Sequence, residues 1–239
     1  MVDLIDRLKA KLYPFLRIER ICRIVFKVRF IYFVKIRRNV RRHPENSGVL
    51  AEDYSLRMLL NGRTSNRPLR LIRPLLAIDR VKRSGDVLSV GCRFELELLY
   101  LTGYGFKPDK IRGLDMISYS PWVDLGNMHA MPYPDNRWDV ILLGWVISYS
   151  DQPEVAAREV IRVCRNGAIV AIGVSYYPME MLMEEKRKGT CVGEPESRKQ
   201  TVAALLDLFA GHVEEVYFTH EAPDKNVQGM CTVIFSIRK

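Results

Sequence analysis

Short apolar runs separated by stretches of helical periodicity organise the chain from about residue 84 onward. The run Val-Leu-Ser-Val at 87–90 ends in Gly91, which is typical of a buried parallel strand that enters a tight turn. A helical segment follows and ends near the Gly-Tyr-Gly of residues 103–105, where glycines let the backbone reverse. The same alternation predicts further strands at 111–115 and 140–145 and a helix at 154–164.

The N-terminal part has a different pattern, in which apolar clusters alternate with bases between residues 16 and 42. The longest run without charge is 30–34, far below the ~20 apolar residues of a membrane-spanning helix. Two sets of bases fall at helical intervals and predict a basic amphipathic helix: Arg20, Arg23 and Lys27, then Lys35, Arg38 and Arg42.

The apolar residues of this segment allow more than one function. They suit the interface of an anionic membrane, with the bases directed to the lipid head groups. They equally suit packing on the main domain or on a second subunit, with the bases as a solvated face. Nucleic acid is disfavoured because no recognised binding motif accompanies the bases. The residues placed on or near one side are Ile21, Ile24, Val25, Phe26, Phe30, Ile31, Phe33 and Val34.

Charge is unevenly distributed along the 239 residues. Residues 1–45 hold thirteen Lys or Arg against four acids, which equals the net charge of +9 of the whole chain. The five cysteines are scattered and form no C-x-x-C pair, which favours neither a disulfide scaffold nor a zinc site. We therefore expect a cytoplasmic protein, held peripherally at the inner face of the membrane if the basic segment binds lipid.

Residues 46–83 connect the basic segment to the α/β region. Asn61-Gly62 reads as a turn, and Pro68 and Pro74 break any long helix. The predicted organisation is a basic amphipathic helical segment at 1–45, a helical lead-in or lid at 46–83, and the α/β domain at 84–239.

Several motifs follow one another inside the α/β domain. The strand at 111–115 ends on a carboxylate, Asp115, as in nucleotide-binding βαβ units. The later motifs are Asn-Met-His-Ala-Met-Pro-Tyr at 127–133, Asp-Asn-Arg-Trp-Asp-Val at 135–140, Asp-Gln-Pro at 151–153 and Arg-Asn-Gly-Ala at 165–168. This succession resembles the class I S-adenosylmethionine-dependent methyltransferases of the type found in ubiquinone and menaquinone biosynthesis.

The resemblance implies a Rossmann-like α/β fold with a mostly parallel seven-stranded sheet and helices on both faces. Its order implies a helix at 197–209, a strand at 212–219 and an antiparallel final strand at 231–237. It implies S-adenosylmethionine as cofactor and a small-molecule, lipid-linked or glycan acceptor. The implied cofactor site contains Gly91, Cys92, Arg93, Glu95, Asp115, Met116, Asn127, Met128 and Trp145.

The loop after the first strand departs from the family pattern. Arg93 and Glu95 replace its second and third glycines, and Ser89 replaces its acid. Glu95 could meet the ammonium of the cofactor's methionine part while Arg93 meets its carboxylate. Alternatively the two could form a salt bridge that plugs an empty site, as in a catalytically silent binding or assembly protein.

No catalytic base stands out from the sequence. His129, next to the expected adenine position, and Tyr149, beyond the strand at 140–145, are candidates for a base or an orienting group; a packing role for His129 is the alternative. Residues 175–183, rich in Tyr and Met, could wall a substrate pocket or pack as core. The other histidines show no metal spacing, so no metal site is expected.

Overall fold

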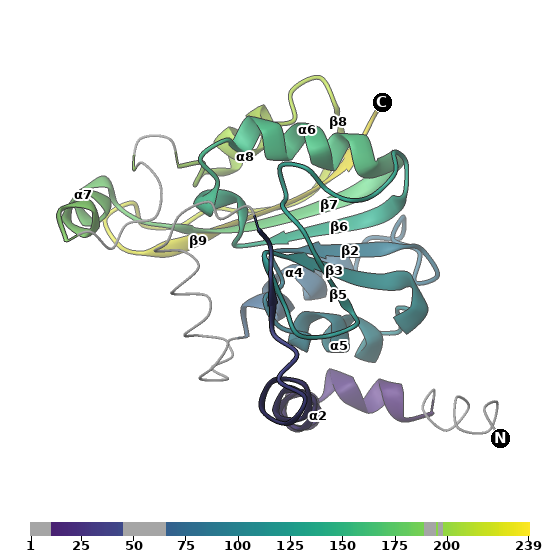
Figure 1. Ribbon diagram of the computed structural model, residues 1–239. Coiled ribbons are helices and arrows are strands. Elements are labelled where there is room, and N and C mark those ends of the chain that lie inside the picture. Colours follow the sequence, from purple (N-terminus) through teal and green to yellow (C-terminus); the bar gives the residue numbers. More distant parts are fainter. Residues whose placement is uncertain (1–10, 45–65, 189–194, 196–197) are drawn as a thin grey trace.

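The computed structural model describes residues 11–44, 66–188, 195 and 198–239 (Figure 1). A seven-stranded sheet in the order β5-β3-β2-β6-β7-β9-β8 forms its centre. All neighbours pair in parallel except β9, which is antiparallel to both β7 and β8. The strands are β2 Val87–Val90, β3 Ile111–Asp115, β5 Val123–Leu125, β6 Trp138–Gly144, β7 Cys164–Tyr176, β8 Val213–His220 and β9 Gly229–Ile237.

Helices cover both faces of this sheet. On one face lie α4 (Arg67–Leu75) and α5 (Leu96–Gly103), and on the other α6 (Pro153–Val163) and α8 (Val202–Asp207) (Figure 1). Successive strand residues alternate between the two cores, so that Val87 packs with α5 and Leu88 with α6. Four further elements belong to the same domain: η3 (Pro108–Lys110), β4 (Ile117–Ser118), η4 (Ile147–Tyr149) and α7 (Met179–Arg187).

The predicted α/β fold is confirmed, including the antiparallel final strand. The predicted strand at 111–115 matches β3, and the predicted helix at 154–164 matches α6 to within one residue. The expected turn at 165–168 is present as an irregularity inside β7, where the register to β6 shifts and Gly167 has a φ of +78°. The predicted helix at 197–209 is shorter: it begins at Val202, where the Thr201 hydroxyl accepts a hydrogen bond from the backbone N–H of Ala204.

The basic segment folds as η1 (Tyr13–Arg17), α2 (Glu19–Phe30) and η2 (Ile31–Ile36), and α2 lies beyond α5 (Figure 1). The prediction that Arg38 and Arg42 continue the helix is wrong. Arg38 has a φ of +50°, and Arg41–Arg42 form β1, which pairs with β4. Hydrogen bonds to a distant strand override the local helical pattern here.

The apolar residues of this segment are divided between two faces, which corrects the expected single apolar side. Cys22, Phe26, Phe30 and Val34 are buried in the core that contains α5, whereas Ile24 and Ile31 are exposed. Packing on the main domain is therefore confirmed for the buried apolar residues of this segment and not for the exposed ones. Among the described residues, no helix is long and apolar enough to cross a bilayer. Asn61-Gly62 and most of the 46–83 lead-in lie outside the described residues; its described part contains α4.

Candidate functional site

The site lies at the carboxyl ends of β2 and β6, where the strand order reverses direction. From β2 the sheet continues to β3 and β5 on one side, and from β6 to β7 on the other, which creates the crevice where open α/β sheets bind ligands. Gly91 ends β2 with a φ of +70°, and a Cβ placed there would lie 2.4 Å from Cγ2 of Val146. A glycine is therefore required at this turn for both conformation and space.

Asp115 lies beside this turn, at the end of β3. Its Oδ2 accepts the backbone N–H of Arg93 at 2.8 Å, and its Oδ1 accepts that of Ile117 at 3.0 Å. Burial raises the pKa of the carboxyl, and the two N–H groups oppose that rise. A carboxylate has about four acceptor sites, and Asp115 is only half-buried. It can therefore accept hydroxyl groups in addition.

Arg93 takes the left-handed conformation of the glycine it replaces, with a φ of +46°. Such a conformation costs a residue with a Cβ roughly 1–2 kcal/mol. A glycine would adopt this conformation without that cost.

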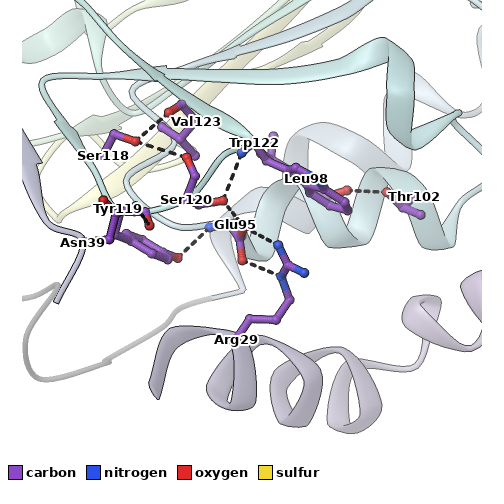
Figure 2. A network of polar contacts seen from close by, with 10 residues as sticks. All are labelled: Arg29, Asn39, Glu95, Leu98, Thr102, Ser118, Tyr119, Ser120, Trp122 and Val123. Atoms are coloured by element: carbon purple, nitrogen blue, oxygen red, sulfur yellow. Dashed lines mark hydrogen bonds and ion pairs between the residues drawn. The ribbon is translucent and has the colours of Figure 1, made fainter. Parts of the chain in front are cut away.

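Glu95 is in a different place from the one its sequence position suggested (Figure 2). Its carboxylate is fully buried and binds Arg29 of α2 through two hydrogen bonds of 2.7 Å, and Ser120 donates a third. Its backbone N–H donates to the Tyr119 hydroxyl. The expectation that Glu95 meets a cofactor ammonium is corrected, because its carboxylate is fully buried and is held by Arg29 and Ser120 of this chain. Neither expectation for Glu95 included its partner Arg29, since the pair spans 66 positions of sequence.

Glu97, which sequence reasoning missed, brings a carboxylate to the site. The Ser89 hydroxyl donates to its Oε1 at 2.7 Å, and a methyl group built on Gly144 would lie 3.3 Å from its Oε2. It therefore lies between the ends of β2 and β6. Burial raises its pKa to about 7, while the hydrogen bond from Ser89 opposes the rise. Ser89 stands where the family pattern has an acid. The sequence signal that could have identified Glu97 as its replacement is its place in the first turn of the next helix, α5.

Asn127 and His129 form a small bridge over the other half of the crevice. The Asn127 side-chain oxygen accepts the His129 backbone N–H at 3.0 Å and lies 2.9 Å from Nδ1 of the same histidine. His129 Nε2 lies 2.6 Å from the Ser150 hydroxyl, and burial lowers the pKa of the imidazole. With both ring nitrogens engaged, His129 connects two loops, which supports the orienting role over that of a base.

Tyr149 and Trp145 border the site from the segment after β6. Tyr149 is partly exposed, and burial raises the pKa of its phenol, which makes it a poor base at neutral pH. Trp145 has a φ of +60°, is buried, and its indole N–H has no hydrogen-bond partner among the described residues. A buried donor without a partner is costly, and this nitrogen has almost no accessible surface.

The other predicted residues contribute mainly through their positions. The Cys92 side chain points back toward β3, since a Cβ on Gly113 would lie 2.5 Å from its sulfur, and burial raises the pKa of the thiol well above its usual range. The Met116 carbonyl accepts the His43 N–H at 2.9 Å, and Met128 is half-buried against the α6 core.

Residues 175–183 combine the two roles expected of them. Leu182 is fully buried, whereas Met179 and Met181 are exposed. Arg198 lies over the rings of Tyr149 and Tyr177 at 5.9 and 5.6 Å from their centroids. This segment therefore borders the site next to Tyr149. A cavity of about 670 Å³ lies elsewhere, between the end of α4 and β8, and shares no residue with the predicted site. No group of metal-ligating side chains occurs in the described part of the chain.

Comparison with known proteins decides what kind of domain this is. Residues 88–172, which run from β2 into β7, match the family model described as a methyltransferase domain. Over these residues the chain is therefore similar to a methyltransferase domain. No curated protein matches the chain.

Solved structures agree with this methyltransferase domain in fold. A putative S-adenosyl-L-methionine-dependent methyltransferase from Methanococcus maripaludis has a TM-score of 0.52 at 16% identity, covering 82% of this chain and 97% of its own. A possible histamine N-methyltransferase from Thermotoga maritima has a TM-score of 0.50 at 17% identity, with 80% and 97% covered. The fold is therefore that of the class I S-adenosylmethionine-dependent methyltransferases, and the acceptor differs among such proteins.

Proposed function

We propose that this protein transfers a methyl group from S-adenosylmethionine to a small-molecule, lipid-linked or glycan acceptor. The observation that carries the proposal is Asp115, held by the backbone N–H groups of Arg93 and Ile117 at the switch point of a methyltransferase domain. A carboxylate in this position accepts ribose hydroxyls in nucleotide-binding α/β folds.

The residues of the crevice fit such a cofactor. Gly91 gives the loop its left-handed turn at the end of β2, where a Cβ would clash with the Val146 side chain. Glu97, which accepts a hydrogen bond from Ser89, would supply a carboxylate for the ammonium of the methionine part.

S-adenosylmethionine supplies an electrophilic methyl group on a sulfonium. The chain's part in the reaction is to align an acceptor with that methyl group and to exclude water, which lowers the barrier through orientation. His129 is held by Asn127 and Ser150 and shapes the site without removing a proton. Tyr149, at the rim beyond β6, is placed to donate a hydrogen bond to the acceptor.

A catalytically silent methyltransferase domain is the second candidate. Two observations favour it: Arg93 stands in a left-handed conformation that glycine would adopt without cost, and Glu95 is occupied by Arg29. Both concern the cofactor loop. The two candidates therefore differ in whether the loop binds the cofactor.

Calorimetric titration of the full chain with S-adenosylmethionine separates them. We expect micromolar binding that falls at least tenfold in Asp115→Ala and is unchanged in Asp109→Ala, an exposed acid in η3. Absence of binding up to millimolar cofactor, with the chain folded by circular dichroism, would overturn the enzyme and favour the silent domain.

The same proposal places the protein in the cytoplasm, peripherally at the inner face of the membrane. Four cysteines of the described residues are free, as suits a reducing compartment. The basic segment supports a position at a negatively charged surface. A membrane position would bring the domain near lipid-linked acceptors.

A further inference from the structure

The outer face of the N-terminal segment exposes an unusual amount of apolar surface. Eight of the thirteen exposed large apolar side chains of the described residues lie between positions 12 and 36. We call the exposed apolar residues of this segment the outer face: Leu12, Phe15, Ile18, Ile24, Val28, Ile31, Tyr32 and Ile36. Soluble monomers rarely gather exposed apolar residues in this way without an interaction that uses them.

The exposed apolar residues of α2 and the residue after it lie on one face of the helix, separate from the face that packs on the domain. Ile24, Val28 and Ile31, which are 62%, 63% and 51% exposed, follow the spacing of a single helix face. Phe26 and Phe30 occupy the opposite face and are buried, in contact with Phe94 of the domain. Arg29 adds its ion pair to Glu95 on the inner side. The helix is thus anchored by one face, and none of the described elements covers the other.

Charge identifies what the outer face fits. Exposed bases flank it, among them Arg20, Lys27 and Lys35. Glu19 is the one acid in residues 11–44, and it pairs with Arg73 of α4. Apolar residues at the centre of a helix face with bases beside them suit the boundary between acyl chains and anionic head groups. A second copy in a two-fold interface would bring the same bases against one another, which disfavours it.

We propose that the outer face docks the protein on an anionic lipid bilayer, with Ile24, Val28 and Ile31 inserted among the acyl chains and Lys27 and Lys35 at the phosphates. This inference gives a surface to the peripheral location of the proposed function and rests on it. Vesicle binding requires neither cofactor nor acceptor, so this inference and methyl transfer can fail independently.

Co-sedimentation of the full chain with phosphatidylcholine vesicles, with and without one quarter phosphatidylglycerol, tests the proposal. We expect binding only to the anionic vesicles. Ile24→Ser/Val28→Ser should lower the partition coefficient at least tenfold, and because serine resembles these residues in helix propensity, α2 should remain folded. The control Val216→Ser/Val227→Ser changes exposed valines outside the segment. Its partition coefficient should stay within twofold of that of the unchanged protein.

A second pair of variants tests the charges. Lys27→Gln/Lys35→Gln should weaken binding to anionic vesicles at least fivefold, whereas Lys82→Gln/Lys107→Gln, two exposed lysines outside the segment, should not. Equal binding by the serine variant and the unchanged protein would overturn the proposal. A different result would also overturn it: the unchanged protein does not bind vesicles but forms a dimer in analytical ultracentrifugation, and the serine variant is a monomer.

Discussion

Arg29 of α2 and Glu95 at the start of α5 form a two-point ion pair, with Nε and Nη2 each 2.7 Å from one carboxylate oxygen. The guanidinium also lies 4.9 Å from the ring centroid of Trp122 and 5.3 Å from that of Phe33. Glu95 replaces a loop glycine and is fully buried. Arg29 of α2 thus neutralises the buried acid at the start of α5.

Arg29→Ala should destabilise the fold by about 3 kcal/mol, because it leaves a buried carboxylate without its partner. Urea unfolding at pH 7 measures the effect. Arg20→Ala removes an exposed arginine from the same helix and should cost less than about 0.5 kcal/mol. The double variant Arg29→Ala/Glu95→Gln should recover part of the loss. If Arg29→Ala and Arg20→Ala cost the same, the pair does not hold the helix in place.

Glu97 should make stability fall as pH rises. Its folded pKa of about 7 lies above the ordinary glutamate value of 4.5, so the folded state retains a proton that the unfolded state has lost between these values. The native chain should lose roughly 2–3 kcal/mol relative to Glu97→Gln between pH 5 and pH 8. Urea unfolding of both proteins at the two pH values measures this difference. Parallel pH profiles would show that Glu97 is ionised in the fold.

Gly91→Ala should cost more than an ordinary left-handed glycine substitution. Gly211 provides the matched control, since its φ is +82° and nothing lies within 4 Å of a Cβ placed there. Gly211→Ala should cost about 1 kcal/mol from conformation alone, and Gly91→Ala about 2 kcal/mol more because of Val146. Gly91→Ala/Val146→Ala should recover much of that excess. Equal unfolding free energies for the two single variants would contradict the close approach.

His129 should titrate below its unfolded value. Burial lowers its pKa, so the folded state favours the neutral ring, and stability should decrease as pH falls below about 6.5, the unfolded histidine value. Proton NMR of the ring in native buffer and in 8 M urea gives the two midpoints. A native midpoint at or above that in urea would exclude the buried neutral bridge to Asn127 and Ser150.

The order of strands and helices in the domain could be predicted from the sequence. Buried parallel strands produce apolar runs such as 87–90 and 111–115, and glycine marks turns that other residues cannot enter. These are local consequences of backbone geometry. Gly91 and Asp115 of the site were identified in the same way, because each stands directly at the end of a strand.

The partners of individual side chains depended on tertiary structure. Glu95 was misplaced because Arg29 lies 66 positions away, and Glu97 was missed because its meeting with Ser89 and Gly144 requires α5 to pack on the sheet. The division of the N-terminal apolar residues into inner and outer faces likewise depended on which face of α2 packs against α5. The strand-end residues followed from the sequence alone, since they depend on short-range conformational preferences, whereas the seven-stranded fold was what the family resemblance implied. Only the packed structure decided which charges are neutralised and which apolar residues remain exposed, because contacts between distant segments form only when the chain folds.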